Sequence, residues 1–322
     1  MKINQLGERA LIQRISKLLS GGGNIVVGAG EDDCAVLDTG SEDYLLVTTD
    51  MLHRKTDFPQ EMTARQIGWM SVAVNLSDLA SKGARPIGVV MAMGIPPDTE
   101  VEFIEDVVKG MDECASKYGT QIIGGDTDSH DELTMTGTAL GMVKKELLIR
   151  RSGAKTGDLV CVTGHLGTAG AALMALEKKK QVSNIIMNAL FEPIPRIIEG
   201  LALVKSRCVT SMMDISDGLA LSLHDMSHAG AAGFRIYEDR LPILPEVKVF
   251  LKGEELLEAA LFVGGDFELL FTLAPDQLEK AREACTLTVI GEVIEKGVFI
   301  DRHGRVEKLG ARGYEHFKSK SQ

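Results

Sequence analysis

Aspartates that stand beside glycine, serine or threonine are the residues of this sequence best suited to carry chemistry. They fall where strands or turns are expected to end, at Asp32, Asp33, Asp50, Asp126, Asp214 and Asp217. A carboxylate next to a hydroxyl side chain supplies the oxygen ligands that Mg²⁺ prefers, and Mg²⁺ usually binds one or two carboxylates together with waters and substrate phosphates. Together these positions indicate a metal cluster, although each aspartate taken alone is also a common turn former or helix cap.

Asp78 differs from the other aspartates because it lies inside an otherwise apolar helical segment, IGWMSVAVNLSDLA. A carboxylate on the apolar side of a helix is costly to bury unless it is paired or bound to a ligand. We therefore expect Asp78 to be paired or to belong to the metal cluster.

The sequence lacks the known short motifs for binding nucleotide phosphates, including the P-loop. The sequence contains no Gly-Lys dipeptide, lacks the H-R-D and D-F-G triplets of protein kinases, and does not complete G-x-G-x-x-G after Gly28. Two other segments could meet phosphate oxygens: the turn GHLGTAG through its backbone amides, and a basic connector through Arg150, Arg151 and Lys155. Close helix–strand packing and a solvated run of charges are the alternative interpretations.

His224 and His228 flank Asp225 in an H-D-x-x-H pattern that resembles a zinc-binding helix. The shorter Asp in place of Glu and the lack of an obvious third ligand argue against zinc. A surface or capping role for both histidines is the favoured interpretation.

The elements that position these residues alternate along the first half of the chain. Strands are expected at 34–38, 44–50, 86–95 and 120–125, helices at 61–82 and 98–117, and a β-rich run at 133–143. The order ββαβαβ with two long helices predicts a sheet covered by helices on one face, an α+β layer.

A basic, glycine-containing connector from Lys144 to Asp158 separates a second unit. It is expected to hold strands at 158–164 and 209–213 and helices at 165–176, 184–190, 195–205 and 218–229. We place the domain boundary near residue 148, which gives an N-terminal domain at 1–147 and a C-terminal α/β domain at 148–322.

Composition limits the choice of partners and compartment. With 35 basic and 46 acidic residues, the net charge of −11 disfavours nucleic acid and anionic membranes as partners. No uncharged apolar stretch is long enough to span a bilayer, and the start lacks a signal-peptide core. Because the five cysteines are scattered, reduced thiols and a cytoplasmic location are expected.

These segments together resemble one family. GAGEDDCAV, TTDML, NLSDLA-x-x-GA-x-P, GGDT, RSGAK-x-GD, DISDGL and the closing GYEHF run almost from end to end. In them the chain is similar to the thiamine-monophosphate kinases, of the superfamily of aminoimidazole ribonucleotide (AIR) synthetase. The resemblance implies the two-domain AIR synthetase-like fold, with ATP and Mg²⁺ bound by the N-terminal domain. It also implies a homodimer whose N-terminal sheets join and whose sites are shared between subunits.

The activity implied by the resemblance is ATP- and Mg²⁺-dependent phosphorylation of thiamine monophosphate to thiamine diphosphate, by direct transfer without a protein nucleophile. The motif matches imply as metal ligands Asp32, Thr48, Thr49, Asp50, Asp78, Asp126, Asp214 and Asp217. The ATP contacts that they imply are Gly125, Asp126, Arg151 and Ser216. The substrate contacts that they imply are Asp57, Asp266 and Tyr314.

The sequence departs from the family pattern at two places. The usual GGEDYEL is GGDFELL here, one residue short, so Asp266 is the carboxylate nearest to the missing substrate-contacting Glu. The extra Glu31 leaves the choice between Asp32 and Asp33 open.

Three rival functions remain. A selenophosphate synthetase usually needs a reactive Cys with a nearby Lys in a glycine-rich start. A hydrogenase-maturation enzyme needs a C-terminal Cys, and the last cysteine of this chain is Cys285. A non-catalytic nucleotide sensor would keep the ATP-binding fold without turnover.

Overall fold

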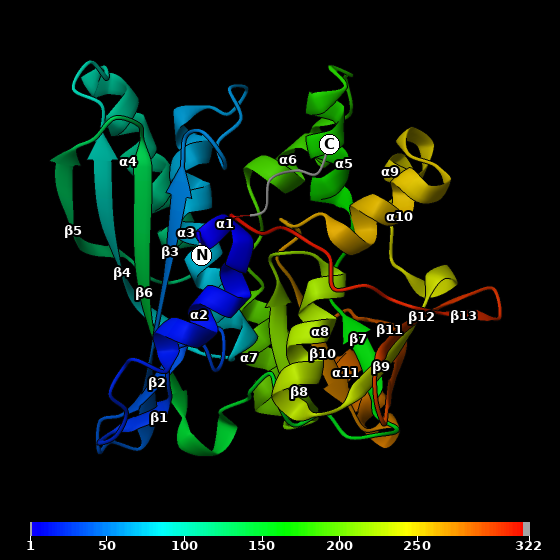
Figure 1. Ribbon diagram of the computed structural model, residues 1–322. Coiled ribbons are helices and arrows are strands. Elements are labelled where there is room, and N and C mark those ends of the chain that lie inside the picture. Colours follow the sequence, from blue (N-terminus) through cyan, green and yellow to red (C-terminus); the bar gives the residue numbers. More distant parts are fainter. Residues whose placement is uncertain (1, 318–322) are drawn as a thin grey trace.

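The computed structural model describes residues 2–317, and Figure 1 shows its two β-sheets lying side by side. The first sheet has the strand order β1-β2-β3-β6-β4-β5 and the second the order β13-β12-β9-β11-β7-β10-β8. Each sheet belongs to one half of the chain and carries its own helices, so the α+β class predicted from the sequence is confirmed.

The N-terminal sheet is antiparallel except where β4 pairs with β5 in parallel. Its strands are β1 (Ile25–Val27), β2 (Ala35–Asp38), β3 (Asp43–His53), β4 (Arg85–Ile95), β5 (Ile122–Ser129) and β6 (Thr134–Lys144). The burial of β6 alternates strictly, with every second residue facing the helices. This alternation is the reason that the helices cover one face of the sheet and leave the other open.

Two helices, α3 (Ala64–Ser81) and α4 (Val101–Lys117), cover this sheet. They cross closely because glycines stand at the contact. A Cβ on Gly68 would lie 1.9 Å from the carbonyl oxygen of Val107, and one on Gly110 would lie 2.0 Å from that of Arg65. Only residues without a side chain allow the two backbones to approach this far.

The C-terminal sheet is a mixed sheet in which β9 and β12 run parallel and the other neighbours antiparallel. Its strands are β7 (Leu159–Val162), β8 (Val209–Ile215), β9 (Gly233–Tyr237), β10 (Glu268–Leu273), β11 (Thr288–Ile294), β12 (Val298–Arg302) and β13 (Arg305–Lys308). The helices of this half are α5 (Thr168–Glu177), α6 (Asn184–Phe191), α7 (Ile197–Ser206), α8 (Leu219–Gly230), α9 (Pro245–Phe250), α10 (Gly253–Phe262) and α11 (Leu278–Ala284).

Helix α3 joins the two halves. It packs on the first sheet and on α4, and it also contacts α7 and β8 of the second half. It is therefore buried along most of its length, and its polar residues Asn75, Ser77 and Ser81 are buried together with its apolar ones. Polar side chains placed on such a helix must find partners inside the protein.

The sequence-based boundaries differ from the structure mainly at chain ends and turns. The N-terminal segment forms two helices, α1 (Ile3–Leu6) and α2 (Glu8–Ser16), and the short strand β1 follows them, none of which is among the elements expected from the sequence. The predicted helix 61–82 begins only at Ala64, because Thr63 caps it by accepting a hydrogen bond from the backbone N of Gln66. Among residues 2–317, no helix has the length and apolar character needed to cross a bilayer.

Candidate functional site

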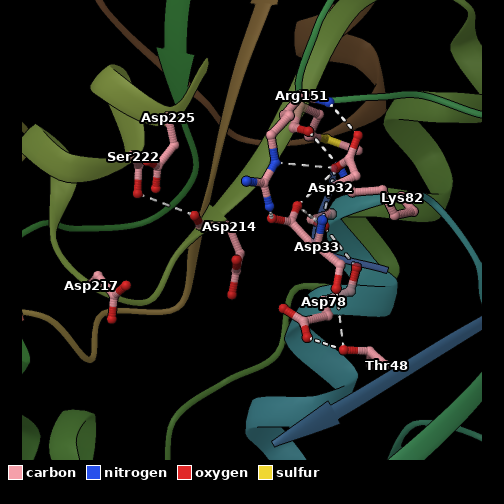
Figure 2. A network of polar contacts seen from close by, with 12 residues as sticks. Asp32, Asp33, Thr48, Asp78, Lys82, Arg151, Asp214, Asp217, Ser222 and Asp225 are labelled. Carbon is pink, nitrogen blue, oxygen red and sulfur yellow. Dashed lines mark hydrogen bonds and ion pairs between the residues drawn. The ribbon is translucent and has the colours of Figure 1, made fainter. Parts of the chain in front are cut away.

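Four carboxylates gather where α3 lies between the two sheets. Asp50 comes from β3, Asp78 from α3, Asp214 from β8, and Asp217 from the turn after β8. Figure 2 shows Asp78 on its helix, with Asp214 lying between it and Asp217 in this view. We call these four residues the acidic face. It exists only because the two domains pack together.

Asp50 and Asp78 are half-buried, and among residues 2–317 no lysine or arginine forms an ion pair with either. Burial, with added repulsion from neighbouring aspartates, raises the pKa of Asp50 to about 6 and that of Asp78 well above its usual value. Thr48 Oγ1 donates a hydrogen bond to Asp78, and the backbone N of Asp50 donates to Asn75 Oδ1 at 3.1 Å. Hydrogen bonds alone leave the negative charge of this pair uncompensated.

Asp214 and Asp217 complete the acidic face from the second domain. Burial is the main cause that raises the pKa of Asp214 to about 7, although Ser77 Oγ donates to it at 2.6 Å. Burial also raises the pKa of Asp217 to about 6, against the lowering effect of Arg9. The Arg9 guanidinium lies 3.2 Å from Asp217 and binds Asp225 with two hydrogen bonds. Nothing in the sequence linked Arg9 to this site, because more than two hundred residues separate the partners.

A second group of charges, beside the acidic face, is neutralised by the protein itself. The ammonium of Lys82 lies 2.5 Å from Asp32 and 2.9 Å from Asp33, and the guanidinium of Arg151 binds both carboxylates. The backbone N of Arg151 also donates to Asp32 at 3.0 Å. Figure 2 shows these four side chains as one cluster. Two anions thus meet two cations, and no sequence signal had pointed to Lys82 as a member.

Of the two adjacent aspartates, Asp33 is the one coupled to the acidic face. Burial would raise its pKa, but the charges of Arg151 and Lys82 outweigh burial and lower it to about 2. The resulting negative charge raises the pKa of Asp50 and of Asp214. Asp33 is therefore the member of this pair whose charge acts on the acidic face.

The acidic face suits a hard divalent cation. Its carboxylate oxygens repel one another, and within the part of the chain that the structure describes they have no lysine or arginine partner apart from Arg9. In that same part, no three His, Cys, Asp or Glu side chains are arranged to surround one ion. Mg²⁺ in proteins is usually held by one or two carboxylates, while waters and substrate phosphates complete the octahedron.

Thr48 and Thr49, expected as metal ligands, point to opposite faces of β3. Thr48 is buried on the side of α3 and reaches Asp78. Thr49 lies on the open face, where its hydroxyl donates to the carbonyl of Gly137 at 2.7 Å and accepts from Thr138. Side chains alternate along a strand. The hydroxyl of Thr49 therefore points away from the face of β3 on which Thr48 and Asp50 lie, and only its backbone remains near them.

Gly125 and Asp126 are not brought to the acidic face. Asp50 on β3 is in register with Gly137, Met91 and Gly125 across the sheet. Three strand spacings correspond to roughly 14 Å. Asp126 is exposed on β5, the outermost strand of its sheet, where its carboxylate accepts only from the backbone N of Thr127 among its described neighbours.

Asp57 and Tyr314, expected as substrate contacts, lie near each other although they are far apart in sequence. Burial raises the pKa of Tyr314 to about 12, and the negative charge of Asp57 and then Asp217 adds to this. The backbone N of Tyr314 donates to the carbonyl of Asp217 at 3.1 Å, which fixes the C-terminal segment on the acidic face. Asp57 itself accepts from the backbone N of His53 and from Thr56.

Asp266 caps a helix. Its carboxylate accepts from the backbone N of Gly167 at 2.6 Å and of Ala169 at 3.1 Å, at the start of α5. Burial is the main cause that raises its pKa to about 7, while these amides act in the opposite direction. The GHLGTAG turn therefore offers its amides to an internal carboxylate.

Ser216 and His224 have backbone partners. The carbonyl of Ser216, between the two aspartates of DISDG, accepts from the backbone N of Gly265 at 2.8 Å. The Nε2 of His224 lies 2.9 Å from the carbonyl oxygen of Leu309. That contact, together with the ion pair of Asp225 to Arg9, gives His224 and Asp225 of the H-D-x-x-H pattern each a structural partner.

Comparison with known families gives the class of the protein. The N-terminal domain of AIR synthase related proteins matches residues 31–143, and the C-terminal domain of the same proteins matches residues 155–302. Fold and site therefore define an AIR synthase related protein of two domains.

Individual relatives narrow this class. The chain is 42% identical over 285 residues to a thiamine-monophosphate kinase of Methanospirillum hungatei, covering 88% of this chain and 92% of the relative. It is 36% identical to that of Pyrococcus horikoshii, covering 86% and 88%. The chain belongs to the thiamine-monophosphate kinase family and is a kinase.

Solved structures agree with this assignment. AaThiL complexed with AMPPCP and TMP superposes with a TM-score of 0.86 at 28% identity, covering 98% of this chain and 99% of that one. The thiamine-monophosphate kinase of Stenotrophomonas maltophilia gives a TM-score of 0.77 at 32% identity, covering 89% and 94%. Hydrogenase-maturation proteins share the fold at 24% identity or less.

Proposed function

We propose that the protein uses ATP and Mg²⁺ to phosphorylate thiamine monophosphate to thiamine diphosphate by direct in-line transfer. The observation that carries the proposal is the acidic face, whose carboxylates come from both domains and, among the described residues, pair with no lysine or arginine except Arg9. Its support is the identity to thiamine-monophosphate kinases and the likeness to a structure that holds AMPPCP and TMP.

Charge explains why an acidic site suits two phosphate substrates. ATP and a phosphomonoester are both polyanions, and the chemistry that Mg²⁺ supplies when bound is neutralisation of their charge. We assign the metal to the acidic face together with Asp33, Asp126, Thr48 and the backbone of Thr49. In place of Asp32 we propose Asp33 as the ligand from this motif, because its negative charge raises the pKa of Asp50 and of Asp214.

The chain's own residues then bind and orient the reactants. Gly125, Arg151 and Ser216 are assigned to ATP, and Asp57 and Tyr314 to the acceptor. The acceptor phosphate is ionised at neutral pH, so its oxygen attacks the γ-phosphorus without a protein base, and alignment of the two is the main task of the protein. Asp266 is withdrawn as a substrate contact, since both its oxygens bind amides of the α5 turn.

The test is product formation by the purified protein. With ATP, Mg²⁺ and thiamine monophosphate we expect ADP and thiamine diphosphate in equal amounts, and neither when EDTA is present or the acceptor is omitted. Asp50→Asn should abolish turnover while the fold persists, and Asp112→Asn on the exposed surface of α4 is the matched control. ATP binding without acceptor-dependent ADP would instead indicate a nucleotide sensor. Turnover that is indifferent to EDTA would refute the metal assignment.

No observation favours a selenophosphate synthetase or a hydrogenase-maturation enzyme. Cys34, Cys114, Cys161 and Cys208 are buried, and burial raises the pKa of Cys34 well above its usual value. A thiol with a raised pKa is a poor nucleophile at neutral pH. Either of these reactions would need a reactive cysteine.

A homodimer with shared sites is part of the proposal. β5 leaves one edge of its sheet unpaired, and the exposed side chains Met51, Ile87 and Ile123 lie on strands of the same sheet. Unpaired edges and apolar patches of this kind are typical of interfaces. A partner copy could then supply Asp126 to a site that it does not reach within one chain. Light scattering should give a dimer, which Ile123→Lys disrupts and Val249→Lys, exposed on α9, does not.

A division into domains 1–147 and 148–322 and a cytoplasmic location complete the proposal. The strands of the two sheets fall on either side of that boundary. All five cysteines are free, which is usual in a reducing compartment. Limited proteolysis in the connector and cell fractionation would test the two statements.

A further inference from the structure

Lys82 is a buried lysine whose ammonium group has an acceptor for each of its three protons. It follows the last turn of α3 and only 1% of its side chain is exposed. Its Nζ lies 2.5 Å from Asp32 Oδ1 and 2.9 Å from Asp33 Oδ2, and it donates to the carbonyl of Met212 at 2.8 Å. An ammonium carries three donors. The three acceptors therefore fix its charge at one point between two carboxylates.

The position is the one that a bound cation would take. The loop that carries Asp32 and Asp33 belongs to the first domain, and Met212 on β8 belongs to the second. Lys82 thus connects carboxylates of one domain to a backbone carbonyl of the other, as a metal ion with oxygen ligands does. Burial by itself would lower the pKa of Lys82, but the two carboxylates outweigh it and raise the pKa, so the charge is permanent at neutral pH.

The distribution of charge divides the site into two halves. Asp32 and Asp33 face Lys82 and Arg151, which gives two charges of each sign. Asp50, Asp78 and Asp214 face no lysine or arginine within ion-pair distance among residues 2–317. A divalent ion placed between Asp32 and Asp33 would compete with Lys82 for the same two oxygens and would meet repulsion from it.

We infer that Lys82 is a built-in counter-ion that takes the place of one divalent cation between Asp32 and Asp33. It acts as a positioning residue: it holds the first acidic motif against the second domain and confines divalent ions to the acidic face. This inference rests on the proposed function, because it presumes that divalent ions bind at the acidic face.

The test counts ions. Mn²⁺ is a suitable probe because it shares the oxygen preference of Mg²⁺ and can be counted by electron paramagnetic resonance and calorimetry. Wild-type protein, Lys82→Met and the charge-balanced double variant Lys82→Met/Asp32→Asn are titrated in the absence of nucleotide. We expect Lys82→Met to bind one more Mn²⁺ per chain than wild type, and the double variant to return to the wild-type number. Lys109→Met, an exposed lysine on α4 paired with Asp106, should bind as wild type does.

Each outcome decides the question. If Lys82→Met binds no more Mn²⁺ than wild type, Lys82 does not occupy an ion position and the inference is wrong. If wild type binds no Mn²⁺, the metal assignment of the proposed function fails first. If Lys82→Met does not fold in EDTA, it should refold when Mn²⁺ is added, since the ion replaces the lost charge. Lack of rescue by Mn²⁺ in a chain whose double variant folds would overturn the inference.

Discussion

Removing the charge of Asp214 should stabilise the metal-free protein at alkaline pH while abolishing its activity. Asp214 is 2% exposed and has a pKa of about 7, against an ordinary value of 3.8. An acid whose pKa is raised by folding binds its proton more tightly in the folded state. Its stabilising effect is complete below the unfolded pKa and is lost as the pH rises through the folded pKa. In the window from 3.8 to about 7, the ionised carboxylate therefore becomes progressively more destabilising.

The size of the effect follows from the shift. A difference of about 3 pKa units at about 1.4 kcal/mol per unit gives about 4 kcal/mol of destabilisation above pH 7. At about pH 5 less than half of this destabilisation remains. Between about pH 5 and pH 8 the contribution of Asp214 to the free energy of unfolding should therefore fall by about 2–3 kcal/mol. Asn has nearly the shape of Asp and keeps an oxygen to accept the hydrogen bond of Ser77, so Asp214→Asn removes the charge with little change in packing.

The assay is urea unfolding in EDTA at about pH 5 and about pH 8. We expect Asp214→Asn to exceed wild type in free energy of unfolding at the higher pH, and to approach it at the lower one. Asp112→Asn, at an exposed position, should follow wild type at both. Mg²⁺ with nucleotide should stabilise wild type and have little effect on Asp214→Asn. A variant that is less stable than wild type at about pH 8 would show that the buried negative charge of Asp214 does not destabilise the metal-free protein.

Three further predictions concern the residues around this face. Arg151→Ala should lower the free energy of unfolding by about 3–5 kcal/mol, because it leaves a buried carboxylate without one of its two cations. Urea unfolding would measure this loss, and unchanged stability would show that Arg151 does not neutralise Asp32 and Asp33. Tyr314→Ala should raise the KM for thiamine monophosphate by about tenfold, because an aromatic contact is lost, and should leave the KM for ATP unchanged. Equal effects on the two KM values would contradict an acceptor contact. Asp126→Asn should abolish turnover yet keep the wild-type pH profile of stability, since Asp126 lies on β5, away from the acidic face; a changed profile would place its charge beside that face.

Local signals in the sequence were sufficient for much of the fold. The β-rich run at 133–143 predicted β6, and the apolar helical segment at 61–82 predicted α3. These signals come from the spacing of apolar residues that are close to one another in the sequence, so they can be read without knowing the tertiary structure. The same applies to Asp78: a carboxylate in an apolar helix must have a partner wherever the helix lies, so its membership of a buried site was predictable.

Other assignments required the arrangement of the two domains. The ion pairs of Asp32 and Asp33 and the capping role of Asp266 depend on where Lys82, Arg151 and the α5 amides come to lie. Asp126 matches a motif as well as any other aspartate does, yet its strand is at the far edge of the sheet. The local spacing of apolar residues does not predict the order of the strands in a sheet, because contacts between distant segments decide that order.

By itself, then, the sequence determined the element types, the acidic character of the site and, through its motifs, the family. The tertiary structure alone decided which carboxylates share a space and which are neutralised. The physical reason is the range of the forces concerned. Periodicity and capping act between near neighbours along the chain, whereas the charge state of a buried carboxylate depends on every charge within a few ångströms, from whichever domain it comes. Lys82 reaches Met212 across 130 residues, and Arg9 reaches Asp217 across 208.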